Sequence, residues 1–304
     1  MYDIIIIGAG PAGLTAALYA LRAEKTVLVI EKGVFGGQIT FSPKIENYPG
    51  FTALSGNELA DKMMEQVIAH GAEFEMETVT RIADEAGVKK VYTEDGAVFE
   101  GKTLIIATGA AHRHLGAPGE EELIGSGISF CAVCDGAFYS GQTVAVIGGG
   151  NSALQEATLL SETCKKVILV QNLPILTGEK RLADALLAKE NVEAVYNSTV
   201  AGFESENGAV AGVKVHNSAT GEDSVIPVEG VFVAIGLVPA TGFLKDTGLL
   251  DEYGYVKADE SCRTAMEGVF VAGDCRTKSV RQITTAAADG ATAALAAAAL
   301  VSAG

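Results

Sequence analysis

The chain has 304 residues, enough for two domains of ordinary size, and 48% of them are hydrophobic, which is ample for buried cores. Its 22 basic and 38 acidic residues leave a net charge of −16, which argues against a nucleic-acid-binding surface. The 36 glycines and seven prolines fit a chain with many tight turns between strands and helices.

The chain begins with an apolar segment that predicts a strand and not an export signal. Residues 1–7 carry no basic leader and no cleavage site. The other long apolar run, residues 291–301, is rich in alanine and about half the length that a membrane span needs. We therefore expect a cytoplasmic protein with no membrane span, whose five cysteines are in a reducing compartment.

A dinucleotide-binding pattern spans residues 3–31. Residues 3–7 are a β-branched run typical of a strand covered on both faces, and the glycine-rich string GAGPAG at 8–13 follows at once. A helical pattern and a second strand that ends at Glu31 complete a βαβ unit. Gly8 permits the tight turn, Gly10 lets the backbone approach a pyrophosphate, and Gly13 lets the helix lie close to the strand. The Glu31 carboxylate is expected to accept hydrogen bonds from ribose hydroxyls.

The next segments are predicted to complete the first domain. Residues 56–70 have the apolar spacing of a helix that ends at His70, which we do not interpret as a metal ligand. Residues 79–99 alternate like a β-meander, and residues 104–107 predict a buried strand. His112 and His114 are expected to face solvent. Together with a linker-like PGEEE sequence at 118–122, they place a domain boundary near residue 115.

Cys131 and Cys134 form a CxxC motif between two glycine-rich strings. Such a pair can close into a disulfide, store two electrons and attack another disulfide as a thiolate. A zinc site usually needs a second close pair, but Cys164 is isolated, and Cys262 and Cys275 are 13 positions apart. A thioredoxin fold is far shorter than this chain, so the pair is better interpreted as part of a larger nucleotide-binding protein.

A second βαβ pattern follows the cysteine pair. It comprises a strand at 143–147, the string GGGNSA at 148–153, a helix to about residue 162 and a strand at 166–170. The segment then reads Gln171-Asn172-Leu173, which has no acid for a ribose diol and no arginine cluster for a 2′-phosphate. Lys180 and Arg181 come later in the sequence and could reach round to a 2′-phosphate.

The chain then returns to the first domain. Residues 268–274 predict a strand ending at Gly273 and Asp274, so Asp274 is expected beside a ligand of the first domain. Arg281 precedes a final alanine-rich helix. The expected fold is α/β, with two Rossmann-like dinucleotide-binding domains. The second, residues 116–241, is inserted into the first, residues 1–115 and 242–304.

In this order and spacing, the motifs resemble the low-molecular-weight thioredoxin reductases nearly end to end. The matching stretches are residues 8–13, 36–38, 46–50, 107–109, 131–136, 148–153, 236–239, 273–274 and 281–282. The resemblance implies a flavoprotein disulfide reductase, usually a homodimer, with FAD in the first domain and a rotation of one domain against the other. The implied FAD-binding residues are Gly8, Gly10, Pro11, Ala12, Gly13, Glu31, Lys32, Gly36, Gly37, Gln38, Asn47, Thr108, Gly109, Gly273, Asp274, Arg281, Gln282 and Ile283.

The same resemblance assigns the catalytic roles. Cys131 is expected to attack the disulfide of a thioredoxin-like partner, and Cys134 to contact the flavin. Asp135 is expected to protonate the leaving thiolate, which requires a carboxyl pKa raised by burial.

The resemblance breaks at the electron donor. NADPH-using members carry a His-Arg-Arg-type motif where this chain has residues 171–173, so the chain is more similar to the subgroup that takes electrons from ferredoxin. The candidate basic residues for docking an acidic ferredoxin are Lys44, Arg113, Lys165 and Lys166.

Three other functions are compatible with the sequence. An NADPH-dependent thioredoxin reductase would bind its nucleotide at a less specific second site. A ferredoxin–NADP reductase of the same architecture needs no CxxC motif. A flavin-bound redox sensor, which is not an enzyme, would turn over no disulfide substrate.

Overall fold

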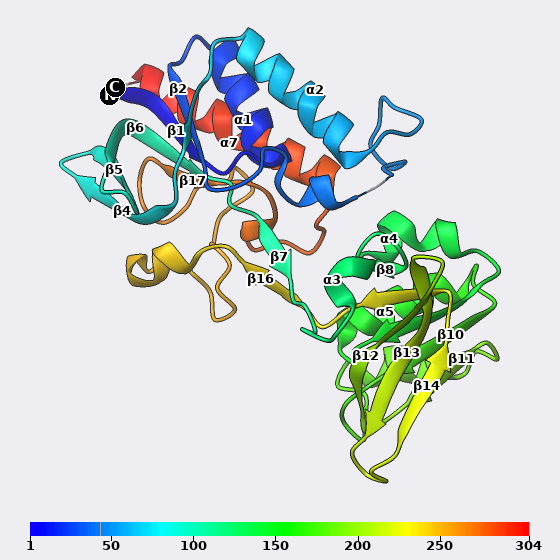
Figure 1. Ribbon diagram of the computed structural model, residues 1–304. Coiled ribbons are helices and arrows are strands. Elements are labelled where there is room, and N and C mark those ends of the chain that lie inside the picture. The colour runs from blue at the N-terminus through cyan, green and yellow to red at the C-terminus, as the bar shows by residue number, and fades with distance from the viewer. Residues whose placement is uncertain (43, 304) are drawn as a thin grey trace. The chain divides into compact units, whose positions relative to one another are not determined.

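The computed structural model describes residues 1–42 and 44–303, and the chain divides into two compact units (Figure 1). Unit 1 comprises Met1–Ala111 and Val238–Gly304, and unit 2 comprises His112–Leu237. The two connections between them pair with each other as β7 (Ala110–His112) and β16 (Leu237–Pro239). The α/β fold expected from the sequence is confirmed.

Unit 1 is built on a mixed sheet in the order β3-β2-β1-β6-β5-β4, with β17 also paired to β6. The strands are β1 (Tyr2–Ile7), β2 (Val27–Glu31), β3 (Glu73–Met76), β4 (Val79–Glu85), β5 (Val88–Thr93), β6 (Val98–Ile106) and β17 (Val269–Val271). β1, β2, β6 and β17 are parallel, so their carboxyl ends meet at one edge of the sheet.

β6 differs from the expected strand at 104–107, because it begins at Val98. Its first half pairs antiparallel with β5, and its second half pairs parallel with β17. The end of the expected meander and the expected buried strand are therefore one continuous strand, which changes partner near Gly101. The sequence pattern missed this because the exposed Glu100 and Lys102 interrupt the apolar run.

The two faces of the unit 1 sheet bury alternate residues of each strand. Ile4 and Ile6 of β1 contact a cluster with helices α1 (Pro11–Arg22) and α7 (Ile283–Ala303), whereas Ile5 and Ile7 face the opposite layer. Figure 1 shows α1, α7 and α2 (Gly56–Ala69) together in this unit. Short 3-10 helices lie at η1 (Gly37–Phe41), η3 (Gly242–Thr247) and η4 (Gly273–Cys275).

α7 is long and apolar enough to cross a membrane by length and composition alone. It packs along α1 through small residues, and a Cβ added to Gly290 would come within 2.2 Å of the Ala12 carbonyl oxygen. Ala293, Ala294 and Ala297 are fully buried in the same cluster. Close backbone approach to α1 accounts for the alanine-rich composition of this helix.

Unit 2 contains a parallel sheet in the order β11-β10-β9-β15-β8 and an antiparallel sheet in the order β12-β13-β14. The strands are β8 (Ile128–Ser129), β9 (Thr143–Ile147), β10 (Lys166–Val170), β11 (Val192–Val195), β12 (Ser198–Glu206), β13 (Ala209–Asn217), β14 (Asp223–Pro227) and β15 (Gly230–Val233). The helices are α3 (Glu120–Leu123), α4 (Ala132–Asp135), η2 (Gly136–Tyr139), α5 (Asn151–Ser161) and α6 (Lys180–Leu187). One core cluster joins α4, α5 and α6 to the parallel sheet, and a second joins the opposite face to β12 and β13.

The segment expected to be a linker is ordered by a buried carboxylate. Glu120 is 1% exposed and accepts the N–H groups of Leu115 and Gly116 at 2.9 and 2.7 Å. The interpretation of 118–122 as a linker is therefore wrong. One of its three glutamates, Glu120, is buried and closes a turn of unit 2 through these two hydrogen bonds.

The expectation that both histidines face solvent is wrong for His112. Its ring stacks on Phe130 at 5.1 Å, and burial lowers the pKa of His112 to about 4. His114 stacks on the same ring at 5.0 Å and remains exposed, with Nδ1 2.7 Å from Glu121 Oε1. The aromatic residue that joins them is 16 positions from His114, so the local sequence gave no sign of it.

Candidate functional site

The first glycine-rich turn connects β1 to α1. Gly8 has φ +105°, and a Cβ at this position would lie 2.4 Å from the Ala107 carbonyl oxygen. A Cβ on Gly13 would lie 1.8 Å from the Gly8 carbonyl oxygen. Gly10 is the N-cap of α1, and Pro11 occupies its first turn. Glycine is therefore required for the tight turn and for the close approach of the helix to the strand.

Glu31 and the segment that follows it close this turn. The Glu31 carboxylate accepts the Ala9 N–H at 2.8 Å and the Gly33 N–H at 2.9 Å. The Gly36 N–H donates to the Ala9 carbonyl, and a Cβ on Gly37 would lie 3.5 Å from the Cα of Gly10. Each carboxylate oxygen retains a lone pair that can accept a ribose hydroxyl. Glu31 and Gly36, both expected at the site from the sequence, therefore meet the glycine-rich turn at Ala9.

Asp274 approaches the same edge of the sheet from the other segment of unit 1. It follows β17, and Gly273 before it has φ +78°, where a Cβ would lie 2.8 Å from the Ala12 Cβ. Burial raises the pKa of Asp274, and its Oδ1 has no hydrogen-bond partner among the residues that the structure describes. A buried carboxyl oxygen without a partner points to a polar ligand at this place.

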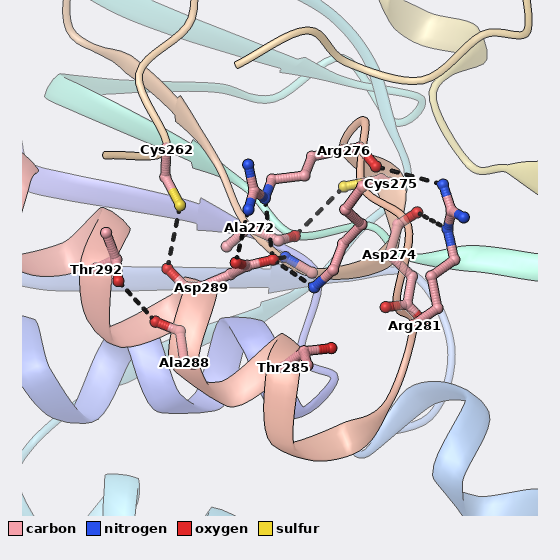
Figure 2. Close-up of polar contacts among 12 residues, drawn as sticks. Cys262, Ala272, Asp274, Cys275, Arg276, Arg281, Thr285, Ala288, Asp289 and Thr292 are labelled. Atoms are coloured by element: carbon pink, nitrogen blue, oxygen red, sulfur yellow. Dashed lines mark hydrogen bonds and ion pairs between the residues drawn. The ribbon is translucent and has the colours of Figure 1, made fainter. Parts of the chain in front are cut away.

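Asp289 of α7 fixes the loop that carries Asp274. Its carboxylate accepts the Gly273 N–H at 3.1 Å, both Arg276 Nε and Nη2, and Lys278 Nζ at 2.7 Å. Figure 2 shows Asp289 facing Arg276, and Arg281 facing the carbonyl oxygen of Asp274, its Nε at 3.2 Å. The sequence interpretation missed Asp289. The signal was a single acid in an otherwise alanine-rich helix.

The remaining expected FAD-binding residues lie around this edge or near it. Asn47 Nδ2 donates to Gln282 Oε1 at 3.3 Å, although the two residues are far apart in the sequence. The Gly109 carbonyl, one residue after Thr108, accepts the Ala240 N–H. Lys32 and Gln38 are exposed, and Ile283 begins α7.

Cys131 and Cys134 form a disulfide in unit 2. Cys131 is the N-cap of α4, and its Sγ accepts the Cys134 N–H at 3.2 Å. Cys164, Cys262 and Cys275 are buried free thiols, and burial raises the pKa of each. Within residues 1–42 and 44–303, no group of three or more His, Cys, Asp or Glu side chains is arranged to hold a metal ion.

Asp135 is a mostly buried acid beside the disulfide. Burial raises its pKa, while the hydrogen bond from the Ser129 hydroxyl at 2.6 Å lowers it by less. Its Oδ1 has no partner in the described part of the chain. Ser129, at the end of β8, was missed from the sequence, because a serine two residues before a cysteine carries no recognisable signal.

The second glycine-rich turn, between β9 and α5, is covered by the segment that follows β10. Gln171 is 4% exposed, and its side chain donates to the Ile175 carbonyl and accepts the Asn172 N–H. A Cβ on Gly149 would lie 2.4 Å from Gln171 Nε2. The Gln171 side chain therefore fills the space next to the glycine-rich turn.

The segment after β10 adds further contacts to this turn. The N–H groups of Thr177 and Gly178 donate to the Gly149 carbonyl at 2.7 and 2.9 Å. The Glu179 N–H donates to Asn151 Oδ1 at 2.7 Å. A dinucleotide pyrophosphate at the start of α5 would have to displace or adjust this segment.

Three of the basic residues near the second turn or proposed for docking form ion pairs with nearby acids. Lys180 Nζ lies 2.7 Å from Asp184, and Lys44 and Lys166 pair with Glu46 and Glu193. Such exposed pairs contribute little to stability, so they hold these lysines only weakly.

Comparisons with known proteins identify the family. Residues 2–290 match the model of the pyridine nucleotide-disulphide oxidoreductases. The chain belongs to this family. It is 45% identical over 290 residues to a thioredoxin reductase of Listeria monocytogenes, covering 95% of this chain and 91% of the relative. It is 41% identical over 294 residues to that of Bacillus subtilis, covering 97% and 93%.

A solved structure extends this agreement to the fold. The crystal structure of the thioredoxin reductase from Streptococcus pyogenes superposes with a TM-score of 0.96 at 43% identity, covering 100% of this chain and 99% of that one. The resemblance of the sequence to the low-molecular-weight thioredoxin reductases is confirmed.

Pyridine nucleotide-disulphide oxidoreductases of the thioredoxin reductase type are FAD flavoproteins. The residues of unit 1 fit this cofactor. The glycines of the turn at Gly8–Gly13 would let the backbone approach a pyrophosphate, the Glu31 carboxylate would accept ribose hydroxyls, and Asp274 offers a buried oxygen without a partner among the described residues.

Proposed function

We propose that this chain is a thioredoxin-disulfide reductase. It passes two electrons from reduced FAD to the Cys131–Cys134 disulfide and then to the disulfide of a thioredoxin-like protein. The observation that carries the proposal is the disulfide itself, held at the N-cap of α4 beside the buried acid Asp135. We also propose that the enzyme is cytoplasmic and works as a homodimer, as is usual for its family.

FAD, when bound, supplies the two electrons that open the disulfide. The Cys131 sulfur already accepts the Cys134 N–H, and a hydrogen bond of this kind strengthens when the sulfur is a thiolate. This supports Cys131 as the sulfur that attacks the substrate. Cys134 is then the sulfur that contacts the flavin.

The thiol–disulfide steps balance without any further reactant. The Cys131 thiolate attacks one substrate sulfur, the substrate S–S bond breaks, and the leaving thiolate takes a proton from Asp135. The Cys134 thiol then gives its proton to the Asp135 carboxylate, and the Cys134 thiolate attacks Cys131 Sγ of the mixed disulfide. This breaks the mixed disulfide, re-forms the Cys131–Cys134 bond and releases the second substrate sulfur, which takes that proton from Asp135. The partner gains two electrons and leaves as a dithiol.

The electron donor is proposed to be ferredoxin in preference to NAD(P)H. Support comes from Gln171, which is bonded to its own loop, and from the exposed, uncharged Asn172 and Leu173 at the place of the family's arginine pair. NADPH is the alternative donor. Adding NADPH, NADH and reduced ferredoxin separately to the oxidised protein, and following flavin bleaching, distinguishes them.

Single cysteine variants test the path through the disulfide. Cys131→Ser and Cys134→Ser are each expected to abolish thioredoxin reduction while FAD remains bound. Cys164→Ser, which replaces a buried free thiol, is the matched control and should retain activity. Full activity in either of the first two variants would show that electrons bypass the pair. A protein that turns over no disulfide substrate at all would instead favour a redox sensor.

A further inference from the structure

Glu156 is a partly buried residue whose carboxyl group the steps above do not use. It lies on α5, on the face that also carries Ala153, Ala157 and Leu160. Those three residues share a core cluster with Ala132 of α4. A Cβ on Gly136 would approach Leu160 Cδ2 to 3.0 Å. Glu156 therefore lies on the face of α5 that packs against α4, the short helix that carries the disulfide.

The Glu156 carboxyl meets the backbone next to Cys131. It accepts a hydrogen bond from the Ala132 N–H, and its Oε2 is buried without a partner among the described residues. Burial raises the pKa of Glu156 to about 7, more than the Ala132 N–H lowers it. A buried, partly unsatisfied carboxyl costs stability.

Other charges around α5 do not neutralise this group. The ionisable side chains on the elements packed against α5 are Asp135, Tyr139, Lys166, Lys180, Arg181 and Asp184. Lys166 and Lys180 are paired with other carboxylates. The Glu156 pKa is set by burial and by the Ala132 N–H, with no charged side chain among its causes. A negative charge forming on Cys131, the residue before Ala132, would act on this carboxyl through a poorly solvated region and raise its pKa further.

We propose that Glu156 is a proton-accepting group of the disulfide site, which takes up a proton when the disulfide is reduced near neutral pH. Glu156 has this task only if the pair carries the redox role proposed above. Two electrons from reduced FAD break the S–S bond. One sulfur takes a proton from solvent, and the other remains a thiolate. That charge favours the neutral form of Glu156, which takes a second proton from solvent.

The coupling is reciprocal, so an ionised Glu156 must raise the pKa of the reduced Cys131 thiol. In a Cys134→Ser background, the pKa of Cys131 is measured from the pH dependence of its alkylation by iodoacetamide. The product is read on the Cys131 peptide by mass spectrometry, because three other thiols are present. Glu156→Gln and Glu156→Leu should each lower the Cys131 pKa by on the order of one unit.

The matched control is Glu162→Gln, which removes the same charge at the C-terminal end of the same helix, where Glu162 pairs with Lys189. It should leave the Cys131 pKa unchanged. Both Glu156 variants remove the charge. The Cys131 pKa is compared in whichever variant keeps the circular dichroism spectrum of the parent and is therefore folded. An unchanged Cys131 pKa, or an equal shift with Glu162→Gln, overturns the proposal. The measurement uses neither flavin reduction nor thioredoxin. A negative result would therefore refute the role of Glu156 without bearing on the proposed reductase activity.

The midpoint potential of the disulfide gives an independent readout in the holoenzyme. Reduction of the disulfide should raise the Glu156 pKa above 7. Between pH 7 and that higher pKa, reduction of the parent should therefore take up one more proton per two electrons than reduction of Glu156→Gln. Equal slopes of potential against pH in the two proteins would contradict the role.

Discussion

The Ser129 hydroxyl donates to Asp135 Oδ2 at 2.6 Å and accepts the Cys131 N–H at 3.1 Å. One buried hydroxyl thus joins the proposed acid to the backbone of the proposed nucleophile. Because both bonds lie within unit 2, they hold Asp135 in a fixed relation to the disulfide. The position of the acid therefore depends on a residue that takes no part in the chemistry itself.

Ser129→Ala is expected to raise the pKa of Asp135 further, by on the order of one unit, since the lost hydrogen bond favours the carboxylate. A general acid must be protonated, so the rate falls as pH rises through its pKa. The alkaline decline of kcat/KM for thioredoxin should therefore move to higher pH. Ser129→Thr keeps a hydroxyl and should restore the parent profile. Identical profiles in all three proteins would rule out the coupling.

Asp135→Asn keeps the shape of the side chain and removes its proton. We expect thioredoxin reduction to slow by on the order of 10²-fold or more, the usual contribution of a positioned acid. Single-turnover mixing of the reduced enzyme with thioredoxin measures this step. Asp223→Asn, which changes an exposed acid paired with His216, is the control and should retain the rate. An unchanged rate in Asp135→Asn would leave Asp135 as a structural turn residue.

The sequence predicted the parts of the molecule that depend on local pattern. The turn at Gly8–Gly13 and the string at residues 148–153 could be recognised because sterics demand glycine where strand and helix meet closely. The CxxC pair was likewise readable, since its spacing alone permits the disulfide.

The contacts that complete the sites depend on residues brought together by the fold. Asp289 meets Gly273 from a different element, and Glu156 reaches the backbone of Ala132 across the α4–α5 packing. Neither pair has a fixed sequence spacing. Glu120 was misread for the same reason, because a run of three glutamates gives no sign that one of them is buried.

Asp289→Asn should destabilise unit 1. The side chains of Lys278 and Arg276 are only 8% and 17% exposed, so the variant leaves two largely buried cations without their carboxylate. Loss of one partner of a buried pair costs on the order of 3 kcal/mol of unfolding free energy. We also expect faster FAD release, because the Gly273–Asp274 loop loses its anchor.

Thermal unfolding and flavin fluorescence of the holoprotein measure these two effects of Asp289→Asn. Asp184→Asn breaks an exposed pair with Lys180 and should change the unfolding free energy by about 0–1 kcal/mol. Equal unfolding temperatures and equal rates of FAD release in the two variants would show that the Asp289 cluster does not hold the loop.

The raised pKa of Glu156 predicts a pH-dependent stability. A rise from 4.5 in the unfolded chain to about 7 in the folded one means that protonation favours folding. This stability is fully present below pH 4.5 and is lost as pH rises through about 7, amounting to on the order of 3 kcal/mol. Urea unfolding at pH 5 and pH 8 should therefore show a smaller loss of stability in Glu156→Leu than in the parent. Parallel behaviour of the two proteins would refute the assignment.

The electron donor can be tested by restoring the charges that the sequence lacks. Asn172→Arg with Leu173→Arg places two guanidinium groups where NADPH-using relatives carry their arginine pair. Charge-assisted hydrogen bonds to a 2′-phosphate contribute roughly 1.5–3 kcal/mol each, so two of them should strengthen NADPH binding by on the order of 10²–10⁴-fold. In stopped-flow experiments the variant should require far less NADPH to reduce the flavin, while NADH, which has no 2′-phosphate, should gain little.

The parent protein should show slow or absent flavin reduction with micromolar NADPH or NADH, and faster reduction by ferredoxin. Asn172→Gln with Leu173→Met is the matched control, because it lengthens both side chains without adding charge. Gln171 remains in place in every protein compared, so its bonds to the loop of residues 171–175 are preserved. Parent flavin reduced faster by micromolar NADPH than by ferredoxin would overturn the donor proposal and show that another part of unit 2 binds the phosphate.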